Sequence, residues 1–165
     1  MLKALSGVFE NKKGLKTAYN YIKVSEASTA PLLIFLHGYM SSKDSEKGQK
    51  LASFAEKSGL DFLSYTAYGK IFKHTNILGT EGSSMEMREV SMSDRIAQIE
   101  DLLSDFILKQ KDYKKIILAG HSLGGYTASI LIRDSQLLRE RLAGALILCP
   151  AIEFPFHYLK YLKPE

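Results

Sequence analysis

Residues 119–125 read Ala-Gly-His-Ser-Leu-Gly-Gly, and this stretch decides how the rest of the chain is interpreted. It contains the pattern Gly-x-Ser-x-Gly, with Ser122 at its centre. An apolar run over 115–119 precedes it directly, and an amphipathic segment over 122–133 follows. This pattern between a buried strand and a helix predicts a tight turn that lifts the serine hydroxyl out of a sheet.

The spacing of the glycines has a physical reason. In such a turn the residues two before and two after the serine come close together, so Gly120 and Gly124 avoid a collision of Cβ atoms. The serine then stands at a helix N-terminus, where N–H groups are free and the helix dipole is positive. We therefore predict that Ser122 is a nucleophile and that the Leu123 N–H helps to hold an oxyanion.

A second apolar stretch is followed by residues that suit the second backbone N–H donor of an oxyanion hole. Residues 32–36 are wholly apolar, which is typical of a strand buried on both faces of a parallel sheet. Gly38 permits a sharp turn that points the next N–H inward, so Tyr39, or else Met40, is the expected second donor. His37 is either a base or a histidine that braces the loop, and its place at a strand end favours bracing.

Apolar strands alternate with amphipathic helices along the chain. We expect strands over 14–24, 32–36, 61–65, 115–119 and 145–149, and helices over 44–58, 93–107, 122–133 and 135–142. Asp44 or Ser45 would cap the first helix, and Ser91 or Ser93 the second. The alternation predicts an α/β fold, a mostly parallel sheet with flanking helices. Residues 66–90 are expected to form a long irregular loop.

The pairing of residues 36–39 with residues 120–125 resembles the α/β-hydrolase fold superfamily. The resemblance extends over about residues 32–150. Within the superfamily, the chain is most similar in type to serine esterases, lipases and acyl thioesterases. It implies hydrolysis of a small carboxylic ester or thioester, in which Ser122 attacks the carbonyl, an acyl-enzyme forms, and water releases it.

The resemblance also implies an acid and a histidine after the nucleophile, in the chain order Ser, Asp or Glu, His. Glu153 follows the last expected strand, where some members of the superfamily place the acid, and His157 is the only histidine beyond it. One interpretation joins Ser122, His157 and Glu153 in a compact triad. The other, which we favour, is a surface glutamate and a loop histidine. His74 in the long loop is a weaker candidate.

The chain ends soon after the strand expected over 145–149. We therefore expect one α/β-hydrolase-like domain over residues 1–165 that is incomplete in its C-terminal part and lacks the last strands and helices. That strand would be an exposed apolar edge, suited to a partner, to the apolar residues 154–162, or to a homo-oligomer. A catalytically inactive relative that binds a partner or itself is the alternative function.

Composition excludes several other classes. The chain has 165 residues, of which 45% are hydrophobic and 24% charged, as in soluble globular proteins. A net charge of +4, spread along the chain, predicts a solvated surface rather than nucleic-acid binding. No apolar run reaches the ~18 residues of a membrane span, and the N-terminus lacks a signal-peptide pattern, so we expect a cytoplasmic protein.

We expect neither a metal nor a cofactor. No His, Cys and carboxylate residues stand at metal-ligand spacing. A nucleotide-binding doubly wound domain is disfavoured, because no glycine-rich phosphate loop follows the first strands. The single cysteine, Cys149, is expected to be a small buried hydrophobe rather than a nucleophile.

Overall fold

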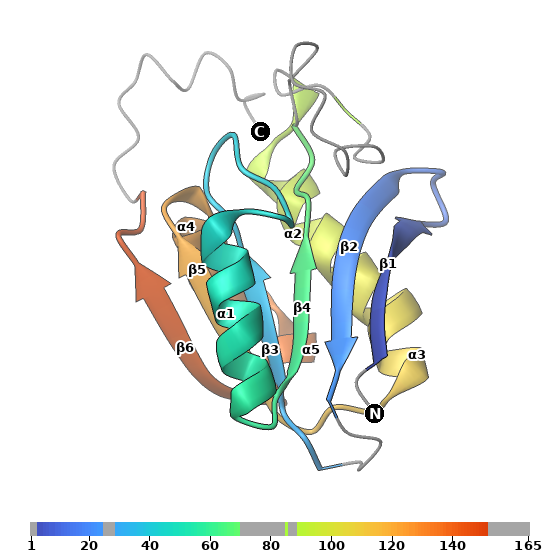
Figure 1. Cartoon of the computed structure of the whole chain (residues 1–165). Coiled ribbons are helices and arrows are strands. Elements are labelled where there is room, and N and C mark those ends of the chain that lie inside the picture. The colour runs from blue at the N-terminus through green and yellow to red at the C-terminus, as the bar shows by residue number, and fades with distance from the viewer. Residues whose placement is uncertain (1–2, 25–28, 70–84, 86–88, 152–165) are drawn as a thin grey trace.

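The computed structural model describes residues 3–24, 29–69, 85 and 89–151. Over these residues the chain forms a six-stranded sheet in the order β1-β2-β4-β3-β5-β6, with helices on both faces (Figure 1). The strands are β1 (Lys3–Glu10), β2 (Lys16–Lys23), β3 (Leu32–Leu36), β4 (Asp61–Tyr65), β5 (Ile116–His121) and β6 (Leu142–Leu148). The helices are α1 (Glu46–Lys57), α2 (Met92–Leu102), α3 (Leu108–Gln110), α4 (Leu123–Asp134) and α5 (Gln136–Arg139), with a π-helical turn, η2 (Leu103–Ile107), after α2.

The mostly parallel sheet predicted from the sequence is confirmed. Strands β4, β3, β5 and β6 are parallel neighbours, whereas β1 and β2 form an antiparallel pair that joins the sheet at β4. The sequence did not predict β1. Its pattern is weak, because Gly7 interrupts the inward-facing residues and Val8 lies on the exposed face with 51% of its surface accessible.

Strand β3 is buried on both faces, as its apolar run predicts. Leu32, Ile34 and Leu36 belong to the larger core, which includes residues of α2, η2 and α4. Leu33 and Phe35 point the other way, into a smaller core beneath α1. Figure 1 shows α1 in front of the sheet and α2 behind it.

Side-chain caps set where the two main amphipathic helices begin. The Ser45 hydroxyl accepts a hydrogen bond from the Gly48 N–H at 3.3 Å, so Ser45 rather than Asp44 caps α1. Ser91 caps α2 in a capping box with Asp94, in which each side chain accepts from the other residue's backbone N–H.

The strand order places a crevice at the end of β3. After β3 the chain crosses by α1 to β4 on one side, whereas β5 lies on the other side of β3. The loops that leave β3 and β5 therefore diverge from neighbouring strand ends. Such a switch point at the carboxyl ends of parallel strands is where α/β sheets bind ligands.

Strand β6 lies at the edge of the sheet over the described residues. Leu146, Ile147 and Leu148 are 46%, 36% and 42% exposed, in line with the apolar edge expected from the sequence. The expectation of a buried Cys149 is wrong. The strand ends at Leu148, and Cys149 follows it as an exposed residue with a φ of 45°. Within the described ranges, no helix combines the length and apolar character needed to cross a membrane.

Candidate active site

Ser122 lies between the end of β5 and the start of α4. Its backbone has φ 55° and ψ −120°, a conformation that costs a residue with a side chain on the order of 1–3 kcal/mol. Neighbouring chain holds it there: the Ser122 N–H donates to the Leu148 carbonyl at 3.0 Å, and the Ala151 N–H donates to the Ser122 carbonyl at 3.1 Å. A strained serine on a strand-to-helix turn is the geometry of a nucleophile elbow.

The elbow leaves no space for side chains at two flanking glycines. A Cβ atom at Gly120 would lie 2.5 Å from the Gly124 carbonyl oxygen. A Cβ atom at Gly124 would lie 2.0 Å from the Leu36 carbonyl oxygen. Because Gly120 has no Cβ atom, the turn can close on itself. Because Gly124 has no Cβ atom, α4 can begin directly against the end of β3.

The turn that follows β3 packs against the elbow. A Cβ atom at Gly38 would lie 3.2 Å from the Ser122 Cβ, so the two segments are in contact. The Ser41 N–H donates to the Gly38 carbonyl at 3.3 Å, which closes a turn around Tyr39 and Met40. Met40 has a φ of 56°, a conformation that this turn position usually reserves for glycine or asparagine.

The two expected oxyanion donors lie on either side of this contact. Leu123 is the first residue of α4, and the first N–H groups of a helix have no acceptor within the helix. Tyr39 follows Gly38 in the turn and lines a hollow together with Ser122. The structure thus brings Ser122, Leu123, Gly38 and Tyr39 to one place.

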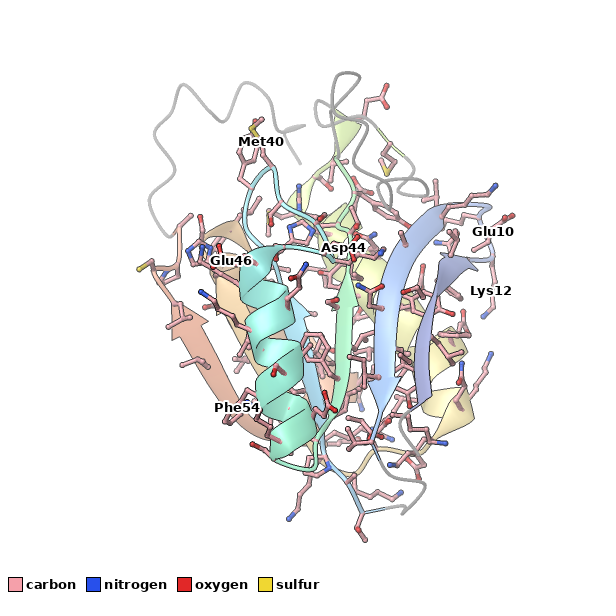
Figure 2. The ribbon with its side chains drawn as sticks, in the orientation of Figure 1. Glu10, Lys12, Met40, Asp44, Glu46 and Phe54 are labelled. Atoms are coloured by element: carbon pink, nitrogen blue, oxygen red, sulfur yellow. The ribbon has the colours of Figure 1, made fainter. Side chains whose placement is uncertain are left out.

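This hollow has a volume of about 240 Å³. Three segments line it: the end of β3 with its turn, the start of α1, and the elbow. The residues are Phe35, Gly38, Tyr39, Ser41, Ser45, Glu46, Lys47, His121 and Ser122. Figure 2 shows Glu46 at the end of α1 nearest the Met40 turn, and Phe54 toward the opposite end of that helix. No sequence pattern singles out Lys47, because only the fold brings the start of α1 to the elbow.

His37 braces the loop, the role that its position favoured. It is buried, its Nδ1 donates to the Gly38 carbonyl at 2.7 Å, and its Nε2 accepts from the Ala67 N–H at 2.9 Å. Burial lowers the pKa of His37 to about 4, and the charge of Arg95 acts in the same direction. With both ring nitrogens engaged elsewhere, the neutral His37 is not placed to take a proton from Ser122.

His121 is a second histidine, directly before Ser122 in the chain. It is partly buried, and its Nδ1 would lie 3.2 Å from a Cβ atom at Gly38, so the ring rests against the turn. Burial, with a contribution from the charge of Lys47, lowers the pKa of His121. The neutral form of this imidazole is therefore favoured.

The remaining site candidates cannot be placed. Glu153, His157 and His74 lie outside the described residues. Within the described part of the chain, no side chain forms a hydrogen bond with the Ser122 hydroxyl. In that same part, no group of three or more His, Cys, Asp or Glu side chains could hold a metal ion.

One curated protein shares sequence with the chain. "Putative esterase/lipase 2" of Mycoplasma pneumoniae is 30% identical over 123 residues, which are 74% of this chain and 39% of that protein. The chain thus spans well under half the length of this relative. No protein-family model matches the chain.

Solved structures resemble the fold at low sequence identity. Est1E from Butyrivibrio proteoclasticus, solved with ferulic acid bound, has a TM-score of 0.73 at 17% identity, covering 93% of this chain and 56% of that one. The α/β hydrolase domain-containing protein 10 from mouse has a TM-score of 0.64 at 18% identity, covering 86% of this chain and 48% of that one. With the strand order, the elbow and the adjoining turn, these likenesses show that the chain has an α/β-hydrolase fold.

Proposed function

We propose that this protein is a serine hydrolase that cleaves carboxylic esters or thioesters through an acyl-enzyme on Ser122. The observation that carries the proposal is the contact between the strained Ser122 elbow and the turn at Gly38. That contact sets a nucleophile beside two backbone segments that can supply oxyanion donors. The esterase/lipase name of the Mycoplasma pneumoniae relative supports the same reaction class.

In this mechanism the Ser122 Oγ attacks the substrate carbonyl carbon while its proton passes to a general base. The carbonyl oxygen becomes an oxyanion, held by the N–H groups of Leu123 and Tyr39. The intermediate collapses as the bond to the alcohol or thiol breaks, and the base returns the proton to that leaving group. Water then attacks the acyl-enzyme by the same route and releases the acid.

The general base is the part of the mechanism that the described residues do not supply. His37 is excluded by its two hydrogen bonds to the backbone. The chain order of the superfamily makes His157 the candidate base and Glu153 the candidate acid that orients it. The proposal for these two residues rests on the sequence alone.

Hydrolysis by matched serine variants tests the proposal. The protein is assayed with p-nitrophenyl acetate and with a short acyl thioester, beside Ser122→Ala and Ser129→Ala. Ser129 lies on α4, the helix that follows Ser122; it donates to the Gly125 carbonyl and is not among the residues that line the hollow. We expect Ser122→Ala to lose turnover and Ser129→Ala to keep it. Equal rates for the protein and Ser122→Ala would refute the acyl-enzyme on Ser122.

A binding or self-associating protein is the second candidate function. The exposed apolar side chains on β6 favour it, because such an edge can pair with a strand of another copy. Sedimentation velocity on the protein and on Leu146→Lys tests this candidate. It predicts a dimer that Leu146→Lys dissociates, and a monomer across the concentration range would contradict it.

A further inference from the structure

Two oppositely charged residues, Glu46 and Lys47, line the hollow beside Ser122. The Glu46 carboxylate accepts from the Lys50 ammonium at 2.6 Å, one turn further along α1, and this pairing, with a contribution from the charge of Lys47, lowers the pKa of Glu46. No ion pair of Lys47 is found among the described residues. Lys47 is therefore the charge that remains for a ligand.

The other polar groups of the hollow are neutral and suit an anion. Tyr39, Ser41 and Ser45 are among the lining residues, and a hydroxyl can donate to a carboxylate. The hollow also lies at the N-terminus of α1, a helix of 12 residues, where the helix dipole has the same sign as Lys47.

The size of the hollow limits the ligand. A volume of about 240 Å³ equals the liquid volume of about eight water molecules at roughly 30 Å³ each. It accommodates an arm of a few carbons that ends in a small charged group. A phosphate is less suited than a carboxylate, because it carries up to two charges, and among the described lining residues there is one lysine and no arginine.

We propose that the hollow binds a short acyl arm with a terminal carboxylate, which pairs with Lys47, so that the favoured substrates are half-esters or half-thioesters of short dicarboxylic acids. This inference rests on the proposed function of Ser122. The acyl arm is assigned to the hollow because the leaving group must depart beside a proton donor. Burial and the nearby charge of Lys47 disfavour the protonated, proton-donating form of His121 on this side.

Two esters of the same shape test the preference. Monoethyl succinate carries the terminal carboxylate, and ethyl succinamate replaces it with a neutral amide. Because Lys47 is exposed, we expect only an about two- to fivefold higher kcat/KM for the charged ester. The ratio should fall toward one in Lys47→Gln and, through screening, in 0.5 M salt. Lys57→Gln, in the last turn of α1, is the matched control and should keep the ratio.

A binding measurement separates this inference from the proposed function. Succinate and succinamide are titrated into Ser122→Ala, with and without Lys47→Gln, and the His121 ring signals are followed by NMR. Succinate binding that weakens with Lys47→Gln supports the site even where no ester is hydrolysed, in which case the proposed function alone fails. Ester hydrolysis with no charge preference, or with one that Lys47→Gln leaves unchanged, overturns the inference and leaves the proposed function standing. Failure of both hydrolysis and succinate binding overturns both.

Discussion

His37 accepts a hydrogen bond at its Nε2 from the Ala67 N–H at 2.9 Å, across 30 positions of sequence. Its Nδ1 donates to the Gly38 carbonyl, so one buried imidazole ties the turn that touches Ser122 to the segment after β4. Each bond uses a different ring nitrogen, and protonation of Nε2 removes the acceptor. The position of the turn therefore depends on a neutral His37.

The protein should lose stability in acid through His37. The pKa of His37 falls from about 6.5 in the unfolded chain to about 4 in the fold, so the unfolded chain binds more protons between these values. The contribution is fully present above pH 6.5 and is lost as pH falls toward 4, about 3 kcal/mol in all. Urea unfolding from pH 4 to 7 measures it. His37→Gln should lack this part of the pH dependence, and parallel curves for the two proteins would contradict the assignment.

Alanine should destabilise the protein at one glycine and have little effect at another. In Gly124→Ala the new Cβ meets the Leu36 carbonyl at 2.0 Å, so either the start of α4 or the end of β3 must move. We expect a loss of about 3 kcal/mol or more, together with loss of Ser122 reactivity. In Gly144→Ala, on β6, no atom of the described residues other than its two chain neighbours lies within 4 Å of the new Cβ, and the unfolding free energy should change by no more than about 0.5 kcal/mol. Equal thermal stability of the two variants would show that the elbow has space for a Cβ atom at Gly124.

The backbone conformation at position 122 should make a residue with a side chain less favourable for protein stability than glycine. Its φ of 55° strains any residue with a Cβ but not glycine. We expect Ser122→Gly to exceed Ser122→Ala in unfolding free energy by about 1 kcal/mol, although both remove the hydroxyl. Guanidinium denaturation of the two variants measures the difference. An alanine variant as stable as the glycine variant would mean that the elbow stores no strain.

A buried ion pair outside the candidate site should contribute to the stability of the fold. The Asp61 carboxylate, at the start of β4, accepts from the buried Lys111 ammonium at 2.8 Å and from the Tyr113 hydroxyl. Asp61→Asn leaves the Lys111 charge buried and should cost about 3–5 kcal/mol. Asp112→Asn breaks only the exposed pair with Lys114 and is the control, with little expected change. A small effect of Asp61→Asn in thermal unfolding would show that water reaches Lys111.

The local parts of the fold could be predicted from the sequence. The buried strand at 32–36, the strand Asp61–Tyr65 and the turn at Ser122 each carry their signal in adjacent residues, and each is present in the structure. Strand β1 was missed because it is half exposed and interrupted by Gly7. Cys149 was misjudged because burial of the last strand depends on what covers it and not on its own apolar residues.

In the candidate site, too, some features follow from local sequence and others only from the fold. The elbow and the Gly38 turn are local patterns, so the sequence identified both. The link from His37 to Ala67 and the approach of Lys47 to the elbow join positions that only the strand order brings together. No periodicity or spacing carries that information.

Labelling with a fluorophosphonate shows whether Ser122 is an activated nucleophile, because this reagent reacts with an activated serine and requires no assumption about substrate. The protein, Ser122→Ala and Ser129→Ala are treated alike and compared by intact mass, with folding checked by circular dichroism. We expect one adduct on the protein and on Ser129→Ala, mapped by digestion to Ser122, and none on Ser122→Ala. A folded protein that gains no adduct, or a Ser122→Ala variant that gains the same adduct, would contradict it.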